Sequence, residues 1–163
     1  MNNVSGTYAP DDQPTATVPY DFYIRDLKVA GAPQRQLALS ATAYPAEGMV
    51  VTGVGKFYGA HYAYYEPFDR TDAAEEGIQS WQPPGYSVFD MHASYALGDL
   101  IPVAGGGDLR LFVNVYNVFD QVFVQDAVDN SAFNSFDGDH DADNAEIFLG
   151  YPRNINLGFQ ITF

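Results

Sequence analysis

Apolar and polar residues alternate strictly over the stretch 153–163, at the end of the chain. In a strand, successive side chains point to opposite faces, so this period of two separates an apolar wall from an uncharged, amide-rich wall. The apolar positions are Ile155, Leu157, Phe159, Ile161 and Phe163. Two structures use such a strand: the lipid-facing wall of an outer-membrane barrel, and a soluble β-sandwich whose apolar face lies in the core.

The same alternation predicts four further strands upstream. Their ranges are about 35–45, 49–63, 86–98 and 108–120. A tight Pro-Ala-Glu-Gly turn separates the first two. We therefore predict an all-β fold in which five main strands, including the last, form an antiparallel sheet in up-and-down order.

The connections between these strands alternate in length. Two of them are short, and two are long and acidic, at 63–85 and 121–150. Residues 1–34 are rich in Pro, Asp and Thr, and we expect a loop there with at most a short ordered piece near 20–25. Short turns at one end and long loops at the other are typical of outer-membrane barrels. This predicts an extracellular loop and partial strand over 1–34, followed by barrel strands over 35–163.

Composition narrows the class of protein. The chain has 21 Asp and Glu against 7 Lys and Arg, giving a net charge of −14, so it lacks the basic stripe that nucleic-acid binding requires. Cysteine is absent, which excludes disulfides and thiolate metal sites. The first residues do not form a signal peptide, although an exported barrel needs one. We therefore expect the chain to be the carboxy-terminal piece of a longer protein.

Two sequence elements carry a family resemblance. Asn-Val-Tyr-Asn-Val-Phe-Asp at 114–120 is followed by an acidic loop, by Gly-Tyr-Pro-Arg at 150–153, and by a strand that ends at Phe163. Taken together, these elements closely resemble the carboxy-terminal signature of TonB-dependent outer-membrane receptors. The resemblance covers roughly residues 29–163.

The resemblance implies about five strands of a 22-stranded transmembrane β-barrel in the outer membrane of a Gram-negative bacterium. Such receptors import a scarce nutrient, for example a ferric siderophore, cobalamin or an oligosaccharide, with energy from the TonB complex. The implied partners are outer-membrane lipid, the barrel assembly machinery, a small-molecule nutrient, and the TonB complex through an amino-terminal region missing from this sequence. In this family the last strand and its terminal aromatic residue are an assembly signal, a role that falls here on Phe159, Ile161 and Phe163.

Aromatic residues gather in the first long connection. Stacking on a sugar or a catecholate ligand is one role for them. The other is an aromatic girdle at the membrane interface together with loop packing. The candidates are Tyr62, Tyr64, Tyr65, Phe68 and Trp81.

Carboxylates recur at every second position in the other long connection. They are Asp137, Asp139, Asp141 and Asp143. Calcium prefers several oxygen ligands from one short flexible segment, so these residues are a candidate calcium site. The spacing departs from an EF-hand loop, and a solvated acidic loop is the alternative. We expect no other cofactor.

Nothing in the sequence supports catalysis. The three histidines are scattered and no Ser-His-Asp arrangement has a supporting context, so we predict that the protein is not an enzyme. The alternative to a receptor is a soluble or surface-attached β-sandwich that binds carbohydrate. That alternative predicts burial of one set of residues against a second sheet, namely Leu37, Leu39, Leu109, Leu111, Leu157 and Phe159.

Overall fold

The computed structural model describes residues 2–9, 11, 16–98, 107–133 and 137–163. The chain forms two compact units, and each contains three separate stretches of sequence. The loop unit comprises Met1–Gln34, Ala60–Pro84 and Val124–Phe148, and the strand unit comprises Arg35–Gly59, Gly85–Phe123 and Leu149–Phe163. Within the described ranges, no helix is long and apolar enough to cross a membrane.

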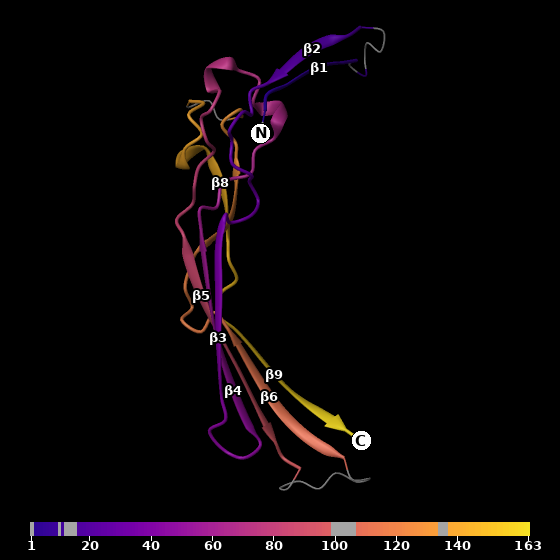
Figure 1. Cartoon of the computed structure of the whole chain (residues 1–163), viewed down its shortest axis with the longest axis vertical. Coiled ribbons are helices and arrows are strands. Elements are labelled where there is room, and N and C mark those ends of the chain that lie inside the picture. The colour runs from indigo at the N-terminus through magenta and orange to yellow at the C-terminus, as the bar shows by residue number, and fades with distance from the viewer. Residues whose placement is uncertain (1, 10, 12–15, 99–106, 134–136) are drawn as a thin grey trace. The chain divides into compact units, whose positions relative to one another are not determined.

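Five strands make up the sheet of the strand unit. They are β3 (Arg35–Ala43), β4 (Met49–Gly59), β5 (Tyr86–Ala96), β6 (Asp108–Tyr116) and β9 (Asn154–Thr162). Each pairs antiparallel with the next, in the order β3-β4-β5-β6-β9. All five strands are labelled in Figure 1. The all-β class and the antiparallel, up-and-down order of these strands are therefore confirmed.

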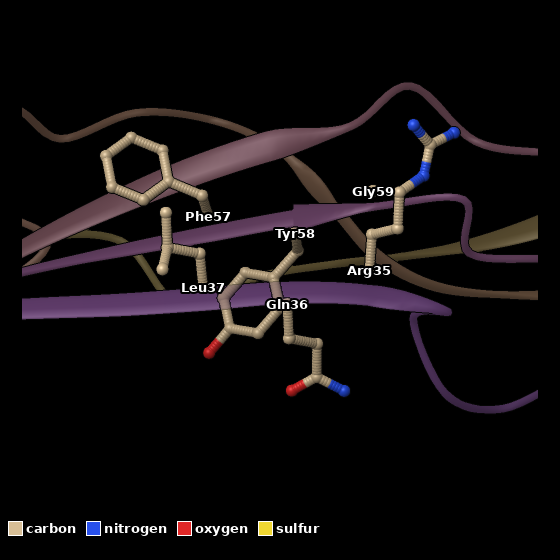
Figure 2. Close-up of a pocket in the computed structure, with 6 residues that line it drawn as sticks. All are labelled: Arg35, Gln36, Leu37, Phe57, Tyr58 and Gly59. Atoms are coloured by element: carbon tan, nitrogen blue, oxygen red, sulfur yellow. The ribbon is translucent and has the colours of Figure 1, made fainter.

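The register of the sheet gathers its apolar side chains on one face. Cross-strand partners share a face, and Leu111 pairs with Tyr95 on one side and with Phe159 on the other. Figure 2 shows this division on β3 and β4, where Leu37 and Phe57 lie on one side of the strands and Gln36 and Tyr58 on the other. The alternation in the sequence thus becomes one continuous apolar face.

This apolar face is largely exposed. Leu157 is 81% exposed and Phe159 is 68% exposed. Of the six residues that the sandwich alternative buries against a second sheet, Leu109 is half-buried and the other five are exposed. In the described residues, no second sheet therefore covers the apolar face.

The opposite face of the sheet pairs its polar groups with one another. Lys56 Nζ lies 2.6 Å from Asp90 Oδ2, and the Asp90 side chain is almost fully buried. On β5 and β6, His92 Nδ1 lies 2.9 Å from Asn114 Oδ1. Charged and amide side chains at mid-strand depth are thus satisfied within the sheet.

The loop unit contains two short strand pairs that the sequence pattern did not predict. The first pair is β1 (Val4–Tyr8) with β2 (Val18–Phe22), in the stretch where a loop was expected. The second is β7 (Val124–Asp129) with β8 (Ala145–Leu149), whose last residue belongs to the strand unit. Among the described residues, three 3₁₀ turns accompany them: η1 (Pro67–Asp69), η2 (Ala73–Glu75) and η3 (Ala142–Asn144). The loop expected over 1–34 is therefore corrected to a strand pair, in which β2 overlaps the ordered piece expected near 20–25, and the connection 121–150 is corrected to contain the second pair.

Candidate functional site

Negative charge is concentrated in the loop unit. This unit holds 16 of the 21 Asp and Glu residues and 3 of the 7 Lys and Arg residues, a net charge of −13. The strand unit holds the other 5 acidic and 4 basic residues, a net charge of −1. Most of the acidic side chains of the protein therefore lie in the loop unit, which contains the two long connections.

Arg70 is the buried cation of the loop unit. Its side chain is 1% exposed, and Nη2 donates to Asp129 Oδ2 over 3.0 Å. Nη1 donates to the carbonyl of Ile78, and the guanidinium lies 5.2 Å from the centre of the Tyr65 ring. Burial lowers the pKa of Arg70, and the negative charges of Asp129 and Glu75 oppose that effect. Arg70 thus stays charged and ties the two long connections together.

Asp129 is the counter-charge of Arg70 and accepts several other hydrogen bonds. Oδ1 accepts from the backbone and the hydroxyl of Ser131, over 3.0 and 2.6 Å. Oδ2 lies 2.7 Å from Nδ1 of His140. Burial would raise the pKa of Asp129, but the hydrogen bonds from His140 and Ser131 hold it below its ordinary value. The carboxylate is therefore ionised at neutral pH.

The five aromatic candidates do not form one platform. Tyr65 is buried beneath Arg70, and Tyr62 and Trp81 are half-buried. Tyr64 is exposed and its hydroxyl donates to Glu66 over 2.9 Å, which raises the pKa of Tyr64. The structure thus separates the residues that the sequence had grouped.

Phe68 joins a different aromatic row, which the sequence analysis missed. Its ring packs edge-on against Phe22, with centroids 4.9 Å apart. Phe22 stacks on Tyr20, and Tyr20 contacts Tyr8. The pairing of β1 with β2 creates this row, and the alternation of Tyr20 and Phe22 was the available signal.

Three of the four candidate calcium ligands come together. Oxygen atoms of Asp137, Asp139 and Asp143 lie within 4.8 Å of one another. Asp141 instead caps η3, where its carboxylate accepts from the backbone of Asp143. A hydrogen bond with the Asp141 carboxyl and the surrounding negative charges raise the pKa of Asp143. A cation would relieve this repulsion, and so would a proton.

Asn117 joins the two sequence elements that carry the family resemblance. It is buried, its backbone has φ 50°, and its side-chain amide donates to the carbonyls of Gln121 and Tyr151 over 2.9 and 3.1 Å. Its Oδ1 accepts from the Gln121 backbone. Asp120, which also has a positive φ, accepts from the Arg153 backbone over 2.8 Å. The two elements thus meet where the chain leaves β6 and enters β9.

The residues of the expected assembly signal lie on the exposed side of β9 and just beyond its end. Phe159 and Ile161 belong to the apolar face. Phe163, one residue past the strand, is 88% exposed. All three are accessible to a binding partner in the described structure.

A hollow lies where β3 begins and β4 ends (Figure 2). Its volume is about 280 Å³, and it is lined by Arg35, Gln36, Leu37, Phe57, Tyr58 and Gly59. It is shallow and open to solvent, and it lies below the usual size range of small-molecule pockets. It therefore does not qualify as the ligand site.

Comparisons of this chain with family models, with curated proteins and with solved structures gave no match.

Proposed function

We propose that this chain is the carboxy-terminal part of a TonB-dependent outer-membrane receptor, which imports a scarce nutrient with energy from the TonB complex. In this proposal the five-stranded sheet is a segment of the barrel wall in the outer membrane of a Gram-negative bacterium. The loop unit belongs to the ligand-facing connections. The nutrient is a ferric siderophore, cobalamin or an oligosaccharide.

The observation that carries the proposal is the division of the sheet into two faces. One face is apolar across all five strands and is exposed on β3 and β9 and exposed or half-buried on the strands between them, as a lipid-facing wall must be. The other carries the charged residues Lys56, Asp90 and Arg110, which a hydrated lumen accommodates. A sandwich core accounts for the apolar face only if another sheet covers it.

The sheet also supports the proposal through its two open edges. In the described residues, β3 and β9 each pair with one neighbour only. Long unpaired edges are liable to aggregate, and closure of a larger barrel removes them. Five strands are too few to close around side chains as large as Arg110 and Tyr58.

A pair of adjacent positions tests which face meets lipid. The chain has no cysteine, so Leu157→Cys and Asn156→Cys each create a single labelling site, on the apolar face and the polar face of β9. Each variant is labelled with an environment-sensitive fluorophore and reconstituted into phosphatidylcholine vesicles that contain a lipid-bound quencher.

We expect strong quenching of the label at 157 and weak quenching at 156. The two sites differ by one residue, so labelling efficiency and depth are matched. Equal quenching at both sites would contradict the proposal. A monodisperse monomer that does not bind the vesicles would also contradict it and would favour the carbohydrate-binding sandwich.

A further inference from the structure

His140 is buried between two carboxylates of the loop unit. Its side chain is 2% exposed, with Nδ1 2.7 Å from Asp129 Oδ2 and Nε2 3.4 Å from Glu75 Oε2. In the part of the chain that the structure describes, neither His140 Nε2 nor Glu75 Oε2 has a hydrogen-bond partner, although both atoms are shielded from solvent. Unpaired buried polar atoms are rare in folded proteins, so these two need an explanation.

An ion pair between a protonated His140 and Glu75 explains the spacing poorly. A charge-assisted N–H···O bond shortens to about 2.7–2.9 Å, and the observed 3.4 Å is much longer. In the same imidazole, Nδ1 does reach that short distance to Asp129. The long distance is therefore confined to the pair formed by His140 Nε2 and Glu75 Oε2.

The two unpaired atoms have the chemistry and the spacing of two ligands of one metal ion. Imidazole nitrogen and carboxylate oxygen both bind Zn²⁺ at about 2.0–2.1 Å, and a tetrahedral angle then separates them by about 3.4 Å. Metal-bound histidines usually donate their other ring nitrogen to a carboxylate, which fixes the tautomer. Asp129 occupies that position behind His140, and Ser131 and Arg70 hold it in place.

A metal ion bound by His140 and Glu75 would link the two long connections of the loop unit. Glu75 ends η2, in the stretch 60–84, and His140 lies in the stretch 124–148. The neighbouring carboxylates of Asp137, Asp139 and Asp143 would raise the local concentration of cations. We infer that His140 Nε2 and Glu75 Oε2 bind a divalent transition-metal ion, with water completing its coordination. This site is separate from the oxygen-only calcium candidate and does not depend on the proposed transport function.

Zinc alone is the probe, added to the full chain in detergent micelles after chelator treatment. Nitrogen NMR of labelled imidazoles reports each of the three histidines separately. We expect the Nε2 signal of His140 to shift as zinc is added and to stop shifting once one equivalent of zinc is present. His92, which already contacts Asn114, is the internal control. A shift confined to His61 or His92 would overturn the assignment.

Substitutions then separate the site from its surroundings. His140→Gln and Glu75→Gln should each weaken zinc binding by at least about tenfold, as loss of a metal contact does. His92→Gln, in the sheet of the strand unit, should stay within about twofold of the unsubstituted chain, and Asp139→Asn tests whether the neighbouring calcium candidate binds the zinc instead. Emission from Trp81, the single tryptophan, checks that each variant keeps its loop unit folded. Unchanged binding in His140→Gln, loss only in Asp139→Asn, or no zinc binding at all would each refute the site.

Discussion

Replacement of Asn117 by alanine should open the junction between the end of β6 and the start of β9. The substitution removes three hydrogen bonds of the buried side chain: two donated to Gln121 and Tyr151 carbonyls and one accepted from the Gln121 amide. At about 1 kcal/mol each they contribute roughly 3 kcal/mol. The φ of 50° adds about 1 kcal/mol, because alanine tolerates the left-handed conformation less well than asparagine.

The expected loss of about 4 kcal/mol has a local reporter. The Gln121 amide bonds to Asn117 Oδ1, so its hydrogen exchange measures opening of this junction. A loss of 4 kcal/mol corresponds to an acceleration of roughly 10³-fold, measured on the chain in detergent micelles.

Two further substitutions divide this loss into its parts. Asn117→Gly removes the same hydrogen bonds but accepts the positive φ, so it should be milder by about 1 kcal/mol. Asn117→Asp keeps the acceptor for Gln121 and loses only the donated bonds. If exchange at Gln121 in Asn117→Ala stayed within about twofold of the unsubstituted chain, the junction would not depend on this side chain and the reasoning would be wrong.

Three other predictions concern the loop unit and the end of the chain. Calcium at sub-millimolar concentration should protect the segment 126–146 from proteolysis if Asp137, Asp139 and Asp143 bind it, and identical cleavage with chelator would leave a solvated loop. The pKa of Asp129 is lower in the folded protein than in the unfolded chain, so its ionised form stabilises the fold above about pH 4, and this stabilisation is lost as the pH falls through the folded pKa. Asp129→Asn should therefore lower the free energy of unfolding at pH 7 and make that free energy less dependent on pH in the acid range. Trp81 emission measures unfolding at each pH. In a full-length receptor, Phe163→Ala should reduce the heat-modifiable barrel in outer-membrane fractions while synthesis continues, and an unchanged barrel fraction would argue against an assembly role.

The strands of the large sheet could be predicted because each alternates over many residues between two chemically distinct faces. The short pairs could not be predicted for the opposite reason. β2 contains Pro19, and β7 carries Asp126 and Asp129 within six residues, so both look like loop. β7 also forms a bridge at Val128 with Tyr64, a contact between stretches far apart in the sequence that no local pattern indicates.

The candidate site shows the same limit. Asp129 is one of many acidic residues in its connection, and nothing local in the sequence indicates that Arg70, 59 positions earlier, neutralises it. Tyr65 and Phe68 look equivalent in sequence, yet one is buried and the other exposed. The stretch 60–85 has no regular period, so no pattern assigns its side chains to an interior or a surface.

The order of the strands also has a consequence for the path of folding. β3 and β4 are joined by 44–48 and β5 and β6 by 97–107, so each hairpin forms by a short loop closure. The joins 60–85 and 117–153 are longer, and loop-closure entropy adds about 0.6 kcal/mol for each doubling in length. These two joins supply most of the residues of the loop unit. The bridge between Tyr64 and Val128 links one join to the other, so it reduces the length of free chain that must close in both. We therefore expect hairpins first, then consolidation of the loop unit, with pairing of β6 and β9 as the late kinetic step that determines the refolding rate.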